Sequence, residues 1–270
     1  MSNAAIHVPH SHRAWLYVLV SIVFVFLLVP IFIVIPMSFS DSKYLEFPPE
    51  ALTLQWYRTF FGSNEWLAAA RNSLSVAAVA TLISVPVGVG AAYALNEARG
   101  RLFVLLRFFL LLPQLIPVVL AAIGVFFLYI RLNLVNTFAG IVVAHSALCI
   151  PFVVITVGAG LKTFDKAQEN AARTLGASRL RAFWDVTVPQ IRLSIIAAVI
   201  FSFITSFDEV VIGLFVAGGS NTLLTRLMFL SLRDQLDPVI AAISSILIVS
   251  SVLAIAGFVA LQRPGREAAR

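Results

Sequence analysis

Two adjacent carboxylates, Asp208 and Glu209, lie in an apolar stretch that extends from about residue 193 to residue 217. A charge at the centre of a bilayer costs at least about 2.5 kcal/mol on insertion scales, so such residues usually face a cavity or a partner. The helical face that carries Glu209 also carries three hydroxyl side chains, those of Ser202, Thr205 and Ser206. This pattern predicts a negative site in the path of a cationic solute. Two alternatives remain: a position near the outer membrane surface, and an ion pair with an arginine of a partner subunit.

The longest polar interval between two apolar blocks is residues 165–192, DKAQENAARTLGASRLRAFWDVTVPQIR. Asp165, followed three residues later by Gln168, fits a helix N-cap with a capping-box partner. Gly176 lies where a helix would end, Ser178 can cap a second short helix, and Pro189 would stop that helix. The interval therefore predicts a helix, a glycine turn and a second helix outside the membrane. The alternative is an amphipathic helix that rests on the membrane surface.

The spacing within this interval resembles the EAA loop of binding-protein-dependent ABC importer permeases. The family pattern is Glu-Ala-Ala, three residues, Gly, nine residues, Ile, one residue and Leu-Pro. Asn170 replaces the glutamate, with Glu169 one residue earlier, and valines replace the two aliphatic residues. The resemblance implies that a loop at about residues 162–192 docks into a groove of an ATPase subunit. The residues it assigns to this coupling are Glu169, Asn170, Ala171, Ala172, Gly176, Ala177, Ser178, Val186, Val188 and Pro189.

A narrower resemblance concerns the stretch SFDEVVIGLFVAGG and the segment TLLTRLMFLSLRDQLDPVIAAISSILI that follows it. Both are similar to the spermidine/putrescine permeases of the same family, and the similarity runs from the first predicted span to the last. Asn72-Ser73-Leu74 also resembles a short signature that often opens the second span. Related branches carry ferric iron or phosphonates, and the motif does not separate them. An acidic pair suits a polycation, so a polyamine is the expected solute.

The family resemblance also implies the partners and the location. They are a dimer of ABC ATPase subunits that binds ATP and Mg, a second homologous permease that forms a heterodimer with this chain, and a solute-binding protein. The expected location is the bacterial inner membrane, in contact with lipid. The expected fold is the all-α fold of type I ABC importer permeases, with six transmembrane helices.

Composition indicates an integral membrane protein. The chain is 60% hydrophobic and 12% charged, and its mean hydropathy is +0.97, whereas a soluble domain usually has about 25% charged residues. The net charge of +6 could indicate nucleic-acid binding in a soluble chain. Here the basic residues lie in short gaps between apolar spans, as the positive-inside rule predicts, which argues against nucleic acid.

Six apolar spans are predicted, at about residues 15–37, 67–95, 102–130, 138–161, 193–217 and 239–261. Tails at residues 1–14 and 262–270 flank this permease domain of residues 15–261. Of the 19 Lys and Arg residues, the predicted outer segments account for Lys43, Arg58, Arg71, Arg131, Arg226 and Arg233. The excess on the other side predicts that both termini and the loop at residues 162–192 are cytoplasmic. Pro113 and Pro117, with Gln114 between them, make the third span a candidate to line the path; the alternative is a purely structural kink.

No stretch matches the P-loop pattern G-x-x-x-x-G-K-[ST], and no hydrolase or zinc-protease motif occurs. We therefore expect a chain that is not an enzyme and holds no cofactor, with ATP hydrolysis in a separate subunit. Cys149 is the only cysteine, and with His145 it gives too few ligands for a metal site, so core packing is favoured for both. His7, His10 and His12 are interpreted as part of a mobile tail. A secondary transporter would need an inverted repeat, and a channel would need a selectivity filter; neither is identified.

Overall fold

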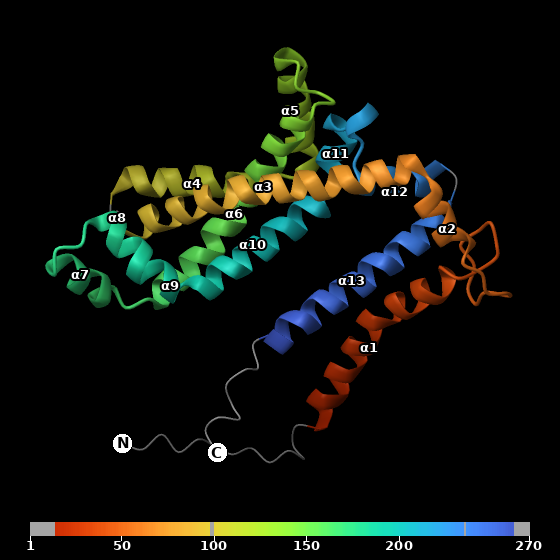
Figure 1. Cartoon of the computed structure of the whole chain (residues 1–270), viewed down its shortest axis with the longest axis horizontal. Coiled ribbons are helices and arrows are strands. Elements are labelled where there is room, and N and C mark those ends of the chain that lie inside the picture. The colour runs from red at the N-terminus through yellow and green to blue at the C-terminus, as the bar shows by residue number, and fades with distance from the viewer. Residues whose placement is uncertain (1–13, 98–99, 235, 262–270) are drawn as a thin grey trace. The chain divides into compact units, whose positions relative to one another are not determined.

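The structure is a computed structural model that describes residues 14–97, 100–234 and 236–261. Within these ranges the chain is helical, apart from turns and one isolated β-bridge between Ser40 and Leu52. The predicted tails, the three tail histidines and Arg99 lie outside the described residues. The chain divides into two compact units: residues up to Ser63 together with those from Ser231 onward, and Asn64–Leu230 (Figure 1).

The first unit contains α1 (Ala14–Met37), α2 (Gln55–Gly62) and α13 (Val239–Leu261), and α13 packs on both of the others. The apolar window of α1, Trp15–Met37, has a mean hydropathy of 3.4 and none of it is buried, as expected for a helix that faces lipid. The connection after α1 is tied to α2 by two hydrogen bonds. Trp56 Nε1 donates to Ser40 O at 2.8 Å, and the hydroxyls of Ser38 and Tyr57 lie 2.7 Å apart.

The second unit is built on α3 (Asn64–Glu97), α6 (Phe138–Thr163) and α10 (Arg192–Phe207), which pack against one another. Small residues allow these helices to approach closely. A Cβ on Gly88 of α3 would lie 2.5 Å from Val153 Cβ of α6, and a Cβ on Gly160 of α6 would overlap the side chain of Ser194 on α10. These glycines therefore permit the close packing of α3, α6 and α10, and α3 continues unbroken through Pro86.

The third predicted span is not one helix. The structure has α4 (Arg101–Leu115) and α5 (Val118–Leu132), which meet at 103° and form the sharp corner visible in Figure 1. Pro117 lacks a backbone N–H and forces the residue before it out of the helical region. Ile116 is extended accordingly, with ψ of 133°. The prolines therefore break the helix, where the sequence predicted one span with at most a kink.

The fifth predicted span is also interrupted. Helix α10 ends at Phe207, the residues Asp208 to Val210 form a connection, and α11 (Val211–Val216) follows. The predicted outer loop at residues 218–238 contains a short 3₁₀ turn, η3 (Gly219–Asn221), and an eleven-residue helix, α12 (Leu224–Asp234). The prediction of one uninterrupted helix to residue 217 was wrong. The break could not be foreseen, because nothing in the local apolar pattern marks it.

Among the described residues, three helices are long and apolar enough to cross a membrane: α1, α3 and α6. Two bent pairs raise this number to five if each pair is one span: α4 with α5, and Arg179–Gln190 with α10, which meet at 78°. Helix α13 is apolar over Val239–Leu253. The structure thus contains a helix or helix pair at each predicted span, and the number of crossings stays a prediction.

Candidate functional site

The polar interval forms the predicted helix, glycine turn and second helix. Helix α7 (Lys166–Thr174) is capped by Asp165, whose Oδ1 accepts from Ala167 N at 3.0 Å, and Gly176 has φ of +96°. Ser178 Oγ accepts from Arg181 N at 3.2 Å and so caps α8 (Arg179–Ala182). The capping-box part of the prediction was wrong, because the Gln168 side chain instead accepts a hydrogen bond from Gln190. We call residues 165–190 the coupling loop.

The second half of the coupling loop consists of consecutive short helical segments that lead into α10. Helix α8 passes into a π-helical turn, η2 (Phe183–Thr187), and then into α9 (Val188–Gln190). A π-turn inserts an extra residue into the helical repeat, which shifts the faces that its side chains occupy. Pro189 lies inside α9, and the helix ends one residue later.

Glu169 is the one acidic residue of the loop that is buried, with 2% of its surface exposed. Its Oε1 accepts from the Tyr93 hydroxyl of α3 at 2.5 Å, and its Oε2 accepts from Thr187 Oγ1 at 2.7 Å. The Tyr93 ring also packs on Phe183, with centroids 4.7 Å apart, and lies 5.4 Å from Arg179 Cζ. Glu169 therefore joins α7, η2 and α3 inside the chain, and its assigned part in ATPase coupling stays a prediction.

The outward side of the coupling loop is formed by residues around the glycine turn. Asn170, Ala171, Gly176, Ser178 and Pro189 are exposed, whereas Ala172, Ala177, Val186 and Val188 are half-buried. Three apolar side chains project from the same loop: Leu175 is 89% exposed, Leu180 68% and Trp184 59%. A hollow of about 590 Å³ between α7 and α8 is lined by Asn170, Arg173, Thr174, Ala177, Ser178 and Arg179.

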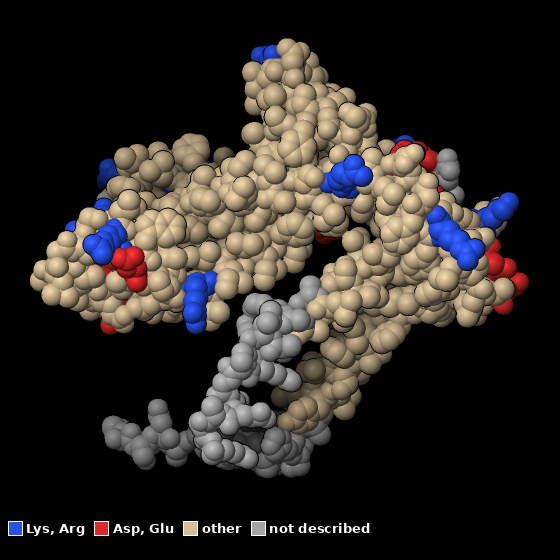
Figure 2. Space-filling model, in the orientation of Figure 1, with Lys and Arg blue, Asp and Glu red and all other residues tan. Residues whose placement is uncertain are grey.

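Charged side chains gather over the coupling loop at one end of the second unit, while the surface over α3 and α10 carries almost none in this view (Figure 2). The uncharged band matches the apolar windows of the long helices. The distribution agrees with a loop that leaves the membrane while α3 and α10 remain in it.

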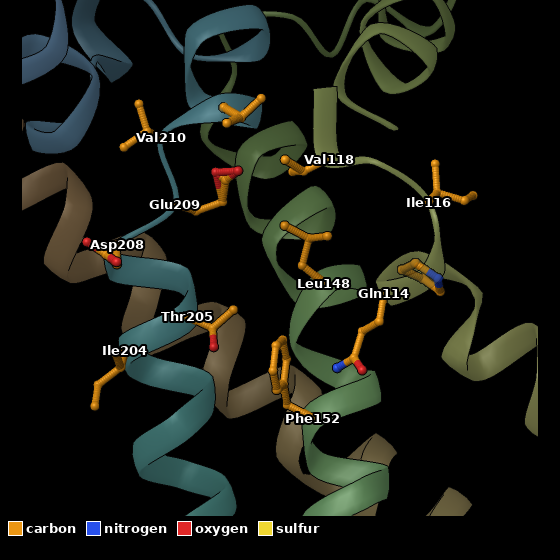
Figure 3. Close-up of a pocket in the computed structure, with 12 residues that line it drawn as sticks. Gln114, Ile116, Val118, Leu148, Phe152, Ile204, Thr205, Asp208, Glu209 and Val210 are labelled. Carbon is orange, nitrogen blue, oxygen red and sulfur yellow. The ribbon is translucent and has the colours of Figure 1, made fainter. Parts of the chain in front are cut away.

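The two broken helices meet at one cavity of about 810 Å³. The α4–α5 junction, helix α6 and the end of α10 with the connection to α11 each contribute a wall (Figure 3). The lining residues are Pro113, Gln114, Ile116, Val118, Leu148, Phe152, Ile204, Thr205, Asp208, Glu209, Val210 and Val211. The predicted path residues Thr205, Asp208 and Glu209 are thus brought together with Gln114 of the third span. We call this space the acidic cavity.

The two carboxylates of the acidic cavity are held differently. Asp208 is exposed at the C-terminus of α10 and, among the described residues, its side chain forms no ion pair or hydrogen bond. Glu209 Oε1 accepts from Ile212 N at 3.0 Å, so it caps α11, and its backbone oxygen accepts from Thr225 Oγ1 at 3.0 Å. Figure 3 shows the Glu209 carboxylate between its connection and α6, whereas Asp208 is directed away from Gln114.

Ser202 and Ser206 do not line the acidic cavity. They are 0% and 4% exposed. Ser206 Oγ lies 2.9 Å from His145 Nδ1, and Cys149 Sγ donates to Ser202 O at 3.3 Å. The interpretation of His145 and Cys149 as packing residues is confirmed. In a continuous helix, Ser202 and Ser206 would lie on the same face as Glu209. Because α10 ends at Phe207, this predicted stripe of path residues is divided.

Some residues of the site carry no sequence signal. Leu148 and Phe152 reach the acidic cavity because α6 packs against α10, and the exposed Leu175 was not singled out. The short Asn-Ser-Leu signature does have a structural role. Asn72 Nδ2 donates to Ser220 O at 2.7 Å, and Ser73 Oγ accepts from Leu224 N at 2.8 Å, so α3 fixes the segment that follows α11.

The chain is similar to known transport proteins over most of its length. Residues 84–264 match the family model described as the binding-protein-dependent transport system inner membrane component. The spermidine/putrescine transport system permease protein PotC of Escherichia coli K12 is 29% identical over 231 residues, covering 86% of this chain and 87% of PotC. The putrescine transport system permease protein PotI of the same strain is 28% identical over 261 residues, covering 94% and 92%.

Solved structures share the fold. A bacterial ABC transporter involved in the import of the acidic polysaccharide alginate matches with a TM-score of 0.70 at 18% identity, covering 95% of this chain and 98% of that one. The alginate transporter in complex with a pentasaccharide-bound periplasmic protein matches with a TM-score of 0.71 at 16% identity, covering 92% and 93%. These likenesses show the fold of ABC importer transmembrane subunits.

Proposed function

This chain belongs to the family of binding-protein-dependent transport system inner membrane components, and we propose that it is a permease subunit that carries a polyamine in an ATP-driven importer. The observation that carries the proposal is the pairing of an outward-facing coupling loop with an acidic cavity at the far end of α10. The loop has the features of a surface for a moving partner. The cavity has the charge and the walls that a polyamine would need.

The coupling loop is built to transmit motion. Glu169 bonds α7 to α3 through Tyr93 and to η2 through Thr187, so α7, η2 and α3 are linked through one buried carboxylate. The loop then continues through α9 into α10, which ends at Phe207, one residue before Asp208 of the acidic cavity. A displacement of the loop by an ATPase pair would therefore reach the cavity through two helices. Discrete, packed connections of this kind are a physical basis for coupling between distant sites.

The acidic cavity suits a chain of methylene groups with ammonium groups. Asp208 and Glu209 supply negative charge, and Leu148, Phe152 and Ile116 supply apolar wall. An ion contact in a partly hydrated cavity is worth about 1–4 kcal/mol at a separation of about 4 Å. The apolar walls would cover the methylene segments between the charges.

The same chemistry argues against the related solutes. A phosphonate is an anion and would be repelled by both carboxylates. Ferric iron needs several hard oxygen ligands, and the described residues hold no group of three or more His, Cys, Asp or Glu side chains. An organic polycation fits the cavity better than either.

The proposal includes the partners of the chain. They are a dimer of ATPase subunits that binds ATP and Mg, a second homologous permease, and a soluble solute-binding protein. The chain would lie in the bacterial inner membrane with both termini and the coupling loop in the cytoplasm. The family description supports the membrane and the binding protein, and the basic residues support the orientation.

Uptake by the reconstituted complex tests the proposal. The chain would be co-expressed with its ATPase, second permease and binding protein, and the complex placed in proteoliposomes with ATP. Labelled spermidine and putrescine, added with the binding protein, should accumulate inside and should stimulate ATP hydrolysis. Vesicles without ATP are the control. Accumulation of ferric iron or a phosphonate, with none of either polyamine, would overturn the polyamine assignment.

A further inference from the structure

A second cavity lies where the last turns of α3 and α6 face α4. Its volume is about 470 Å³. Its polar lining residues are Asn96 of α3, Arg107 of α4, and Lys162 and Thr163 of α6, and its remaining lining residues are apolar, among them Leu111. The cavity is separate from the acidic cavity, with which it shares no residue. We call it the basic cavity.

The two basic residues of this cavity have no counter-charge among the residues that the structure describes. No Asp or Glu lines the basic cavity, and neither Arg107 nor Lys162 forms an ion pair within the described part of the chain. The nearby Glu97 is engaged elsewhere, since its Oε2 lies 2.5 Å from Lys166 Nζ. The lining therefore carries a net positive charge that calls for an anion.

The surroundings of Arg107 place that anion at the edge of the bilayer. Arg107 is six residues after Arg101, at the start of α4, and so lies about 9 Å along the helix axis. Its neighbours Leu106, Phe108 and Phe109 are 43%, 52% and 58% exposed, as expected for a helix that faces lipid. An arginine at that depth normally meets a partner or extends to the interface.

The apolar part of the cavity offers space for a hydrocarbon chain. Gly158 of α6 lines the cavity, and a Cβ built on it would meet no atom within 4 Å. Ile155, one turn earlier, is 50% exposed, and Leu111 lies on the facing helix α4. A free phosphate ion would use the basic residues alone and would leave this groove empty.

We propose that the basic cavity binds an anionic phospholipid, with its phosphate between Arg107 and Lys162 and an acyl chain along Leu111 and Ile155. Basic pockets between membrane helices at the cytoplasmic surface are suited to anionic headgroups. The proposal needs the coupling loop to be cytoplasmic, as in the proposed function, and does not need the solute to be a polyamine. Because Lys162 precedes α7 by four residues, a lipid held there would anchor the base of the coupling loop to the membrane.

Native mass spectrometry of the full complex, released from nanodiscs of mixed phosphatidylglycerol and phosphatidylcholine, tests the proposal. The wild type should retain phosphatidylglycerol in preference to phosphatidylcholine. Arg107→Gln with Lys162→Gln should lower the retained phosphatidylglycerol by about tenfold or more. Gly158→Leu keeps both charges but fills the groove and should also lower retention. Arg101→Gln, on the same helix outside the cavity, is the matched control and should retain the lipid.

Three results would overturn the proposal: unchanged retention in the double variant, equal retention of both lipids by the wild type, or displacement of the lipid by millimolar inorganic phosphate. If the double variant fails to assemble, Gly158→Leu decides, because it leaves the basic residues in place. The readout is lipid retention and not transport, so a failure here is distinct from a failure of polyamine uptake.

Discussion

The buried carboxylate of Glu169 accepts a hydrogen bond of 2.5 Å from the hydroxyl of Tyr93, which lies 76 residues earlier in the chain on α3. The second oxygen of the same carboxylate accepts from Thr187. One side chain thus fixes both halves of the coupling loop to the longest helix of the protein. The position that the family pattern gives to glutamate is held by Asn170, which is exposed, whereas the neighbouring Glu169 is buried.

Glu169→Ala should uncouple the loop from α3. The change leaves the hydroxyls of Tyr93 and Thr187 without their acceptor, at a cost on the order of 2–4 kcal/mol in stability. We expect ATP hydrolysis that no longer drives uptake, measured in proteoliposomes beside thermal unfolding. Tyr93→Phe removes one of the hydrogen bonds and keeps the ring packing on Phe183, so it should have a smaller effect. Unchanged stability and coupling in Glu169→Ala would show that the hydrogen bonds of Glu169 to Tyr93 and Thr187 have no role.

Gly176→Val should impair uptake while the complex still assembles. The residue has φ of +96°, and a Cβ there would meet no atom within 4 Å, so the cost is in the backbone and not in packing. A β-branched residue resists this conformation by about 1–2 kcal/mol and should tilt α8 away from α7. Gly176→Asn is the control, because asparagine adopts the left-handed conformation more readily. Solute-stimulated ATP hydrolysis and uptake would be measured for both variants. If the valine variant were as active as the wild type, the conformation of this turn would not be needed for coupling.

The parts of the fold that were predictable follow from local chemistry. The cap at Asp165, the positive φ of Gly176 and the apolar length of α1 are each set by residues within one or two turns, and the structure confirms them. The acidic pair Asp208 and Glu209 could also be singled out from the sequence. Two charges in an apolar stretch are costly in a membrane, whether or not the helix continues past them.

The rest depends on tertiary packing that the local pattern does not encode. Prolines are tolerated inside membrane helices, as Pro86 of α3 illustrates, so Pro117 alone could not distinguish a kink from a 103° break. The end of α10 at Phe207 has no nearby glycine or proline to mark it. Once the helix ends there, Glu209 turns to cap α11 and Ser206 remains against His145. The predicted stripe of path residues was divided for that reason.

The coupling loop and the segment after α11 should lie on opposite sides of the membrane. Single cysteines at Ala171 and Arg233, both exposed, would be introduced into a Cys149→Ala background. We expect a membrane-impermeant thiol reagent to label position 233 in intact spheroplasts, and position 171 only after the membrane is opened. Labelling of both positions in intact spheroplasts would contradict the six-span layout.

Replacing the charges of the acidic cavity should reduce polyamine transport without weakening the fold. In Glu209→Gln the amide oxygen can still accept from Ile212 N, so the cap of α11 is kept while the charge is lost. Asp208→Asn removes a charge from a side chain with no structural partner among the described residues. Because each ion contact is worth about 1–4 kcal/mol, the double variant should lose roughly tenfold or more in transport efficiency for spermidine. Asp234→Asn removes an acidic group outside the cavity, one that pairs with Arg233, and should transport normally.

Two further measurements separate attraction of the solute from support of the fold. Binding of the polyamine to the soluble receptor should not change in any variant, because that step takes place on another protein. Glu209→Ala loses the cap as well as the charge, at a cost of about 1 kcal/mol, so it should lower the unfolding temperature where Glu209→Gln does not. Uptake is normalised to assembled complex. Full transport by the Asp208→Asn, Glu209→Gln double variant would remove the acidic cavity from the solute path, since no other described carboxylate lines it.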